Sequence, residues 1–379
     1  MRILHVDHTA VLGGAERSLL ELAAAQRRRG DDAIVAVGGP GPFSAALEEA
    51  GVPWLSLDLP RSYAGLAART SLLGAALRAP AFALAAWRLR RAVSRVRPDM
   101  VQVHTRKGHV LATPALAFSR RRSVWHLRDR VPPRRLARLV MRAGMRRTSH
   151  AVGLSKWIVE EYERAGFRPR SGRIGIVPSG IDGRRLGKLP TPWLDGRRGP
   201  VIGFVGQITE WKAPHLVLQA FELLDGPPDR RLAIYGDVVF PAADHGYGAG
   251  LEAKIAASPQ RERIDRVRGA GPEQAFAAID ILVHSSTAPE PFGRVVVEAL
   301  AARRPVVALP HGAPAELLEG GRGVLAARCD APALAEALAG LLADRKAAVR
   351  MAGLGPARAA EFQPDAVAGQ MAREYETIG

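Results

Sequence analysis

The segment IDILVHSSTAPEPFGRVVVEAL, residues 279–300, carries the pattern that decides the fold class. It begins with an apolar run, continues through a loop that contains two prolines, and ends in a run with helical spacing that starts near Gly293. A buried strand followed by a loop and a helix is the repeating unit of parallel α/β sheets. The segment therefore predicts one such unit, with its strand ending near Ser285.

The same alternation extends through the whole chain and predicts an α/β protein. Strands are expected in the first half at 2–7, 33–37, 100–104, 123–127, 150–154 and 174–177. Strands are expected in the second half at 201–205, 232–235, 279–284, 306–309 and 324–326. A helix is expected over 16–29, with Gly30 at its C-terminal cap.

This order of elements predicts two Rossmann-like domains, 1–190 and 191–362. The stretch 183–200 is rich in glycine, proline and charge and is the best candidate for the linker. The last residues, 363–379, look helical and could pack back toward the first domain. Two such domains are expected to face each other across a cleft, with ligands bound at the carboxyl ends of the strands.

The charge of the chain is concentrated in one segment. The 379 residues carry a net charge of +17, yet 61–150 holds 21 basic and 2 acidic side chains while 191–379 holds 20 and 23. The 48 arginines against 6 lysines fit a GC-rich genome, but genome composition does not explain why one segment has so few carboxylates. A nucleic-acid-binding protein is disfavoured, because no binding-module motif and no regular aromatic interleaving accompany the arginines.

Other composition features exclude several classes. The single cysteine, Cys329, excludes a disulfide framework and a metal site built from cysteines. The first ten residues look like a strand and not like a signal peptide. The most apolar window, 64–87, is interrupted by Arg69 and Arg78, so no run is long enough to span a bilayer. We expect a cytoplasmic protein, either free or peripheral on the inner face of the membrane.

Two glycine-containing loops follow expected strands. Gly13 and Gly14 open the helix after the first strand, where backbone N–H groups can approach a phosphate or sugar; a plain turn that needs positive φ explains them equally well. Their spacing is not the G-x-G-x-x-G of dinucleotide enzymes. In GQITEWK, 206–212, Lys212 is either a counter-ion for a diphosphate or a solvated surface lysine.

The loop at 285–293 is the most specific signal. Its backbone donors and the N-terminus of the following helix suit an anionic or hydroxyl-rich ligand. Glu298, in the first turns of that helix, can bind a ribose diol, or it can simply favour the helix dipole. Glu290, in the loop, can meet a sugar hydroxyl or a developing positive charge, or it can cap the helix.

Glu290 and Glu298 form an E-x7-E pair, and the chain resembles glycosyltransferase family 4, the retaining GT-B enzymes, also called glycosyl transferases group 1. The resemblance runs from Gly13 to about Glu361, with its motifs in the expected order. The motifs are GGAERSLLELA, VGLSKWIVEEY, IVPSGID, VGQITEWKAPHLVLQAF, PEPFGRVVVEALA and PVVALPHGAPAE.

The resemblance implies a hexosyltransferase that moves a sugar, with retention, from a nucleotide-diphosphate sugar to a hydroxyl of a glycan or lipid-linked acceptor. Such an enzyme would serve cell-envelope or exopolysaccharide biosynthesis and would need neither a metal nor another cofactor. The resemblance implies catalytic roles for Glu290 at the donor sugar, Lys212 at the leaving diphosphate and His126 at the acceptor side. It implies donor binding by Gly13, Gly14, Gly206, Gln207, Pro291, Phe292, Gly293, Arg294 and Glu298.

His126 has a second interpretation, and the resemblance points to two further residues, His104 and Ser155. His126 could be a strand-end histidine satisfied by its neighbours, His104 is a secondary candidate, and Ser155 is explained fully as a helix N-cap. Two other functions remain open, a nucleotide-sugar epimerase of the same fold and a non-catalytic, membrane-associated relative.

Three positions depart from the family pattern. Gln207 replaces the usual arginine, which removes one charge-assisted donor to phosphate, and Arg294 could compensate. Ala213 replaces a glycine, and Arg303 or Arg304 stands where another glycine is usual, so the helix there must end without the ease with which glycine adopts positive φ. These changes bear on donor affinity and identity, but not on the fold.

The basic segment 61–150 mixes arginines with apolar residues in two stretches. One contains Leu72, Leu73, Leu77, Phe82, Leu84 and Trp87, followed by Arg88, Arg90, Arg91, Arg95 and Arg97. The other runs over 134–147 and contains Leu136, Leu139, Val140 and Met145. Basic amphipathic helices are typical of membrane-surface elements, although ordinary domain helices with solvated arginines have the same pattern. An anionic membrane is therefore a candidate partner, and nucleic acid is not.

Overall fold

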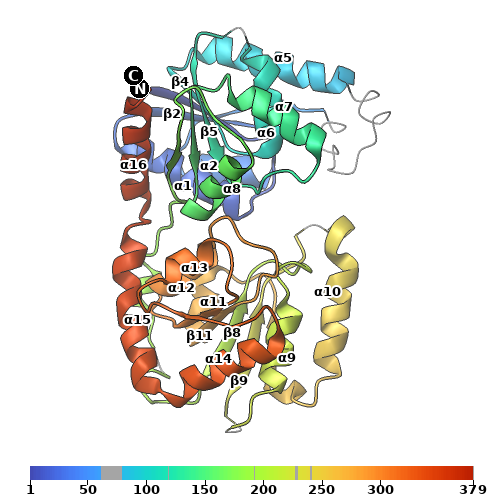
Figure 1. Cartoon of the computed structure of the whole chain (residues 1–379), viewed down its shortest axis with the longest axis vertical. Helices are drawn as coiled ribbons and strands as arrows, with labels where there is room; N and C mark the ends of the chain where they lie inside the picture. The colour runs from blue at the N-terminus through green and yellow to red at the C-terminus, as the bar shows by residue number, and fades with distance from the viewer. Residues whose placement is uncertain (61–78, 118, 192, 227–228, 240, 379) are drawn as a thin grey trace. The chain divides into compact units, whose positions relative to one another are not determined.

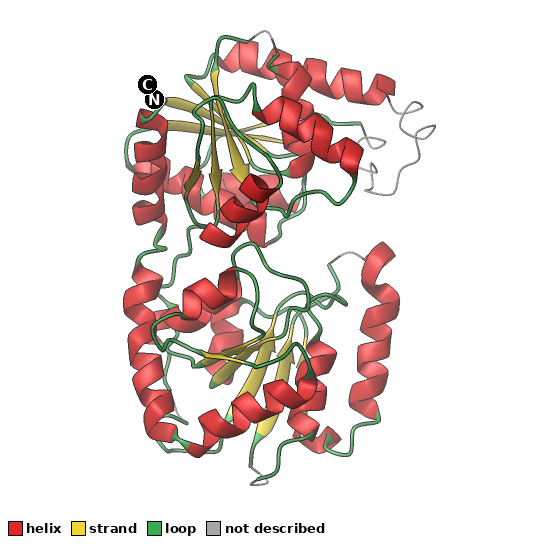
Figure 2. Ribbon diagram, in the orientation of Figure 1, coloured by secondary structure: helices red, strands yellow, loops and turns green. Residues whose placement is uncertain are grey.

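A computed structural model describes residues 1–60, 79–117, 119–191, 193–226, 229–239 and 241–378. The chain forms two compact units, unit 1 from Met1–Gly180 and Pro364–Gly379, and unit 2 from Ile181–Gln363. Each unit contains one parallel sheet with helices on its faces, as Figure 2 shows. The predicted α/β class is confirmed.

The sheet of unit 1 has seven strands in the order β3-β2-β1-β4-β5-β6-β7. Its strands are β1 Arg2–Val6, β2 Asp32–Val37, β3 Trp54–Ser56, β4 Met100–Val103, β5 Arg122–Leu127, β6 His150–Gly153 and β7 Ile174–Ile176. Its helices are α1 Gly14–Arg28, α2 Pro42–Glu49, α5 Ala79–Val96, α6 Arg106–Ala115, α7 Arg135–Met145, α8 Lys156–Arg164 and α16 Pro364–Glu376. The order of strands reverses between β1 and β4, which is where doubly wound sheets bind ligands.

The sheet of unit 2 has six strands in the order β10-β9-β8-β11-β12-β13. Its strands are β8 Val201–Val205, β9 Arg231–Tyr235, β10 Ile264–Val267, β11 Ile281–His284, β12 Val306–Ala308 and β13 Val324–Leu325. Its α-helices are α9 Pro214–Glu222, α10 Pro241–Ala256, α11 Pro272–Ala278, α12 Arg294–Ala301, α13 Ala313–Leu318, α14 Ala331–Ala343 and α15 Arg345–Ala360. Here the order reverses between β8 and β11.

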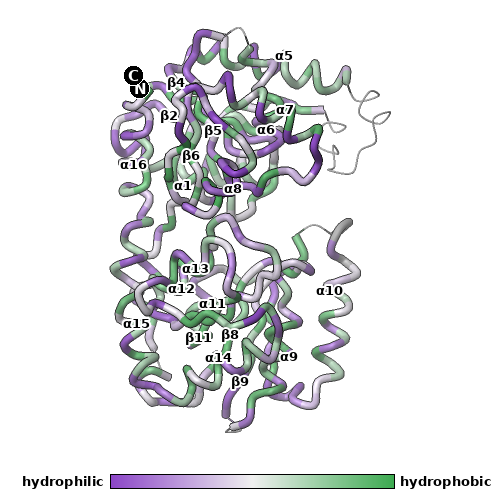
Figure 3. Tube along the Cα trace, viewed as in Figure 1, coloured by the Kyte–Doolittle hydropathy of each residue, from purple (hydrophilic) through white to green (hydrophobic). Residues whose placement is uncertain are grey.

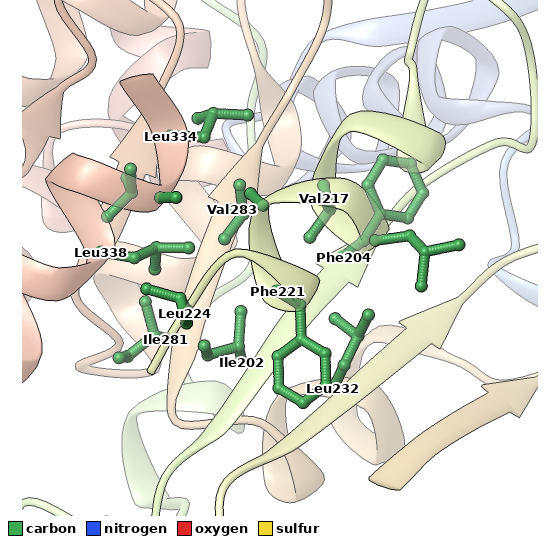
Figure 4. Packing of buried hydrophobic residues seen from close by; sticks show 14 of the residues in the cluster. Ile202, Phe204, Val217, Phe221, Leu224, Leu232, Ile281, Val283, Leu334 and Leu338 are labelled. Carbon is green, nitrogen blue, oxygen red and sulfur yellow. The ribbon is translucent and has the colours of Figure 1, made fainter. Parts of the chain in front are cut away.

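The core of unit 2 explains why these segments fold as they do. Ile202 and Phe204, two residues apart on β8, point to one face of the sheet, as alternation along a strand requires. Val217 and Phe221, four residues apart on α9, meet them there (Figure 4). The helix α14 packs beside α9 and contributes Leu334 and its neighbours to the same cluster.

The expected linker is part of unit 2. The boundary falls at Gly180/Ile181, not at 190/191, and Trp193 and Leu194 are buried in the unit 2 core. The chain returns from unit 2 to unit 1 between Gln363 and Pro364, close to the expected start of the C-terminal helix.

The C-terminal helix α16 belongs to unit 1 and packs along α1 (Figure 1). Val367, Met371 and Tyr375 join Ile3 and Met100 in one buried apolar cluster. The two ends of the chain are therefore parts of one core.

A buried polar network lies under α16. The Tyr375 hydroxyl donates to Gln102 Oε1 and accepts a hydrogen bond from Gln26 Nε2 at 3.2 Å. Gln26 Oε1 lies 2.7 Å from His5 Nε2, and His5 Nδ1 lies 2.9 Å from His104 Nε2. Burial lowers the pKa of His5 to about 4, so the ring is neutral at neutral pH.

Among the described residues, no helix combines the length and the apolar character needed to cross a membrane. Along α5 an apolar first half is followed by a second half that carries the arginines, and in α7 arginines are interspersed with apolar residues (Figure 3).

Candidate active site

The candidate site of unit 2 lies where the strand order reverses. The loop 206–213 follows β8 and the loop 285–293 follows β11, and these two strands are hydrogen-bonded neighbours. Because the strands are parallel, both loops emerge at the same edge of the sheet. The two most informative motifs of unit 2 are therefore adjacent in space.

Backbone and hydroxyl contacts hold the two loops together. Ser285 Oγ donates to the carbonyl oxygen of Lys212 at 2.8 Å, and the Thr287 N–H donates to the carbonyl oxygen of Trp211 at 2.8 Å. The Nζ atom of Lys212 lies 4.3 Å from the centre of the Trp211 ring, a cation–π distance. The position of the Lys212 ammonium group is thereby set by both loops.

Glu290 is the centre of a compact charged cluster. Its Oε2 atom accepts hydrogen bonds from Lys212 Nζ at 2.6 Å, from His284 Nε2 at 2.7 Å and from Ser286 Oγ at 3.1 Å. No described residue donates to the other carboxylate oxygen, Oε1. One oxygen is thus saturated, and the second is available to a ligand.

The cluster keeps Glu290 ionised. Burial alone would raise the pKa of its carboxyl group, but the Lys212 ammonium group and the His284 ring, through their electrostatic interactions and hydrogen bonds, hold that pKa well below its usual range. A carboxylate that stays charged at the edge of a sheet can stabilise a positive charge that develops on a sugar ring.

His284 and Ser286 are functional candidates that the sequence analysis missed. His284 is the last residue of β11 and its side chain is 4% exposed, so the sequence pattern predicts the end of an apolar strand at this position. The available signal was a polar residue at the carboxyl end of a buried strand, directly before the loop that carries Glu290.

The loop 289–293 is cradled by the loop that follows β12. A Cβ atom at Gly312 would lie 2.5 Å from the Glu290 nitrogen, and φ at Gly312 is +75°, so only glycine fits. The Ala313 N–H donates to the carbonyl oxygen of Glu290 at 2.9 Å. The glycine at position 312 therefore allows the loop after β12 to approach the Glu290 backbone and hold it in place.

The predicted binding residues at the start of α12 differ in whether the backbone or the side chain is available to a ligand. Gly293 has φ of +95° and precedes the helix as its N-cap. The Phe292 ring is buried against Phe362, with ring centres 5.5 Å apart, so its backbone and not its side chain is placed to contact a ligand. Glu298 is buried, and its Oε1 atom accepts a hydrogen bond from Arg294 Nε at 2.9 Å.

Gln207 lies in the loop after β8, directly after Gly206. Its side chain is half-buried and makes no hydrogen bond within the described chain. A Cβ atom at Gly236 would lie 1.7 Å from the carbonyl oxygen of Gly206, so the loops after β8 and β9 touch through glycine backbones. This close contact fixes the backbone from which Gln207 projects.

Two positions at which the resemblance expects glycine have a left-handed backbone conformation. Ala213 has φ of +49° and Arg303 has φ of +55°. Arg303 follows the C-cap residue of α12, so this helix ends with a residue other than glycine at positive φ. Each such residue costs about 1–2 kcal/mol relative to the right-handed conformation.

The predicted glycine loop of unit 1 lies at the carboxyl end of β1, where its sheet reverses order. Gly13 is the N-cap of α1, and its N–H donates to Glu16 Oε2 at 2.9 Å. Gly14 is exposed. In this arrangement the N–H of Gly13 is already paired inside the protein, so a contact between this N–H and a diphosphate would require Glu16 to move away.

His126 is enclosed within unit 1. The ring is fully buried, with Nδ1 3.3 Å from Gln102 Nε2 and Nε2 3.1 Å from the carbonyl oxygen of Val177. Both nitrogens are therefore paired within unit 1, as the alternative of a satisfied strand-end histidine expects. His104 is also fully buried, and Ser155 Oγ caps α8 by accepting the Ile158 N–H at 3.2 Å.

Two family models match the chain one after the other. The model described as Glycosyltransferase Family 4 matches residues 12–185, and the model described as Glycosyl transferases group 1 matches residues 194–356. The chain belongs to this glycosyltransferase family. The matched ranges include the glycine loop of unit 1 and the Lys212–Glu290–Glu298 motifs of this family member.

Curated relatives of this family member are glycosyltransferases by name. The D-inositol 3-phosphate glycosyltransferase of Corynebacterium urealyticum is 34% identical over 238 residues, which are 56% of this chain and 53% of that protein. The phosphatidyl-myo-inositol mannosyltransferase of Mycobacterium leprae is 29% identical over 53% of each chain. The chain spans about half the length of the curated relatives it matches.

Solved structures match the whole length of the chain. The crystal structure of HepE from Anabaena in complex with UDP-glucose has 26% identity, covers 100% of both chains and has a TM-score of 0.82. The sucrose-phosphate synthase of Thermosynechococcus elongatus has 16% identity and a TM-score of 0.81, which is a likeness of fold alone. The GT-B fold predicted from the sequence motifs is confirmed.

Proposed function

We propose that the protein is a retaining hexosyltransferase that moves a sugar from a nucleotide-diphosphate sugar to a hydroxyl of a glycan or lipid-linked acceptor. The observation that carries this proposal is the cluster of Lys212, Glu290 and His284 at the switch point of the unit 2 sheet. It supplies a cation and a carboxylate within one small region, which glycosyl transfer from a diphosphate requires.

The two charges serve the two ends of the bond that breaks. When the bond between the sugar carbon and the diphosphate oxygen breaks, negative charge grows on the diphosphate and positive charge grows on the sugar ring. Lys212 neutralises the diphosphate, and the free Oε1 of Glu290 faces the sugar. In this proposal protein cations and backbone N–H groups hold the diphosphate, and no metal ion takes part.

The relatives support the choice of substrates. HepE was solved with UDP and with UDP-glucose, which supports a nucleotide-diphosphate sugar as donor. Relatives named for inositol phosphate and phosphatidyl-myo-inositol support a hydroxyl acceptor, free or attached to a lipid. A role in cell-envelope or exopolysaccharide biosynthesis follows as part of the proposal.

The test is donor binding by the wild type and by Glu298→Ala. A thermal-shift panel of UDP-, GDP- and ADP-sugars should show one class that raises the melting temperature, because binding stabilises the folded state by mass action. Glu298→Ala should weaken binding of that donor by about tenfold or more, since a charged hydrogen-bond acceptor is lost.

Glu336→Ala is the matched control, because Glu336 is an exposed carboxylate of α14 in the same unit. A panel in which no nucleotide sugar stabilises the wild type overturns the proposed function. Equal donor affinity in Glu298→Ala and wild type overturns only the assignment of Glu298.

The same proposal places the protein on an anionic membrane through α5 and α7. On α7 Leu136 is 59% exposed and Leu139 is 62% exposed, among the arginines of that helix. On α5 the exposed Trp87 ring lies 5.4 Å from the guanidinium carbon of Arg91. Met145 is buried in the core, and Leu72, Leu73 and Leu77 lie outside the described residues.

Vesicle co-sedimentation tests the membrane surface. The wild type should bind vesicles that contain phosphatidylglycerol more strongly than neutral vesicles, and Leu136→Ser/Leu139→Ser should weaken that binding by about tenfold or more. The control is Val349→Ser/Leu354→Ser, which removes two similarly exposed apolar side chains from α15 of unit 2. Equal binding to anionic and neutral vesicles would contradict the proposed surface.

A further inference from the structure

Unit 1 contains a polar depression at the opposite edge of its sheet from the glycine loop. It has a volume of about 470 Å³ and lies where β5 and β6 begin, beside the end of α7 and the last turn of the chain at Thr377 and Ile378. Since all strands of the sheet are parallel, this edge is the amino-terminal one, whereas Gly13 follows the carboxyl end of β1.

Five arginines surround this depression, and no carboxylate lines it. They come from three separate segments: 120–122 before and at the start of β5, 147 after α7, and 170 before β7. Within the described chain, none of these five side chains has an ion-pair or hydrogen-bond partner. This differs from the other cations of unit 1 near this edge, since Arg173 is paired with Glu374 at 3.0 Å.

The floor of the depression is rigid. Trp125 is 1% exposed and stacks on His109, with ring centres 4.5 Å apart. A Cβ atom at Gly144 would lie 2.3 Å from Thr113 Oγ1 and 2.8 Å from the Trp125 ring, so α7 approaches β5 closely at this point. The site is therefore formed by packed elements of unit 1.

Hydroxyl groups complete the lining. Ser123 is 7% exposed and Thr148 is 3% exposed, and Ser149 Oγ accepts a hydrogen bond from the Ser123 N–H at 3.1 Å. Hydroxyls and guanidinium groups are the donors that phosphate oxygens take, and arginine binds them in pairs. The volume lies within the range of roughly 300–1,000 Å³ of small-molecule sites, and so exceeds what one phosphate fills.

Like charges that line one depression without counter-ions repel one another, and a bound anion reduces that repulsion. We propose that this pocket binds a small, soluble phosphorylated molecule that carries two or more phosphate charges. The site is separate from the donor site, which lies in unit 2. Occupancy would join the chain end at Thr377 and Ile378 to the starts of β5 and β6, and so hold α16 on unit 1.

Hydrogen exchange of the full chain with pyrophosphate as the probe tests this inference. At ionic strength matched with potassium chloride, pyrophosphate should slow exchange in peptides that cover 119–123, 144–149 and 374–378. Arg122→Gln/Arg147→Gln should weaken this protection by about tenfold or more in apparent affinity, since each charge-assisted contact to phosphate contributes at least that factor.

The matched control is Arg90→Gln/Arg146→Gln, which removes the same charge from exposed arginines of unit 1 that do not line the pocket. The control should keep wild-type affinity. Equal loss in both double variants, or protection confined to the unit 2 loops 206–213 and 285–298, would overturn the proposal. Binding to phosphatidic acid vesicles with none to pyrophosphate would also overturn it, because the ligand would then be a lipid headgroup.

Discussion

Replacing Lys212 with methionine should lower kcat/KM for glycosyl transfer by about a hundredfold to a thousandfold. Lys212 Nζ is held by contacts to Glu290 and Trp211, so its charge is in place before the diphosphate leaves. Loss of one preorganised donor to a developing negative charge costs about 2.7–4 kcal/mol in enzyme transition states. The measurement is initial rate with the donor identified in the thermal-shift panel, in buffer that contains EDTA.

Lys254→Met is the control, because Lys254 is an exposed lysine of α10 in the same unit. It should leave kcat/KM within about twofold of the wild type, as surface substitutions away from a site usually change little. A Lys212→Met variant that is folded and equally active would remove the diphosphate role from Lys212. Wild-type activity that vanishes in EDTA would contradict the metal-free reaction.

Replacing Tyr375 with alanine should destabilise unit 1 by about 3–5 kcal/mol, the usual cost of deleting a buried aromatic side chain. The side chain is 3% exposed in the cluster that joins α16 to the sheet, and its hydroxyl connects Gln26 and Gln102. Because a protein with two units does not unfold in one step, the free energy should be read from amide exchange in β4 rather than from one melting temperature.

Tyr375→Phe separates packing from hydrogen bonding. It keeps the ring but leaves Gln26 and Gln102 without their shared partner, and it should cost about 1–3 kcal/mol. Exchange in unit 2, for example in β8, should not change in either variant. If amide exchange in β4 were the same in Tyr375→Ala as in the wild type, α16 would not be what stabilises unit 1.

The sequence pattern predicts the central strands and the edge strands β7 and β13, but not the edge strands β3 and β10. β11 and β12 are buried throughout and β8 is buried at its centre, so their hydrophobic pattern is strong. In β3 and β10 the pattern is weak because half-buried polar residues interrupt these short strands. The expected boundary at 190/191 was misplaced because a stretch rich in glycine and proline also contributes Trp193 and Leu194 to a core.

The residues of the candidate site could be predicted from its motifs, but their arrangement in space could not. The spacing of Glu290 and Glu298 identified the loop and the helix, but not that Lys212 would lie 2.6 Å from Glu290. That distance depends on which strands are neighbours, a non-local property of the sheet. His126 shows the reverse case, since a motif match cannot tell that a ring is buried with both nitrogens paired.

Unit 1 is discontinuous in sequence, and this fixes the order in which the two units can be completed. Unit 2 is one uninterrupted stretch, Ile181–Gln363, and all of it is synthesised before α16. Unit 1 lacks Val367, Met371 and Tyr375 from its core until the final helix has been made. Unit 2 is therefore the first unit whose sequence the ribosome completes. In a nascent chain that stops at Gln363, the apolar residues of unit 1 that pack against α16 are left uncovered.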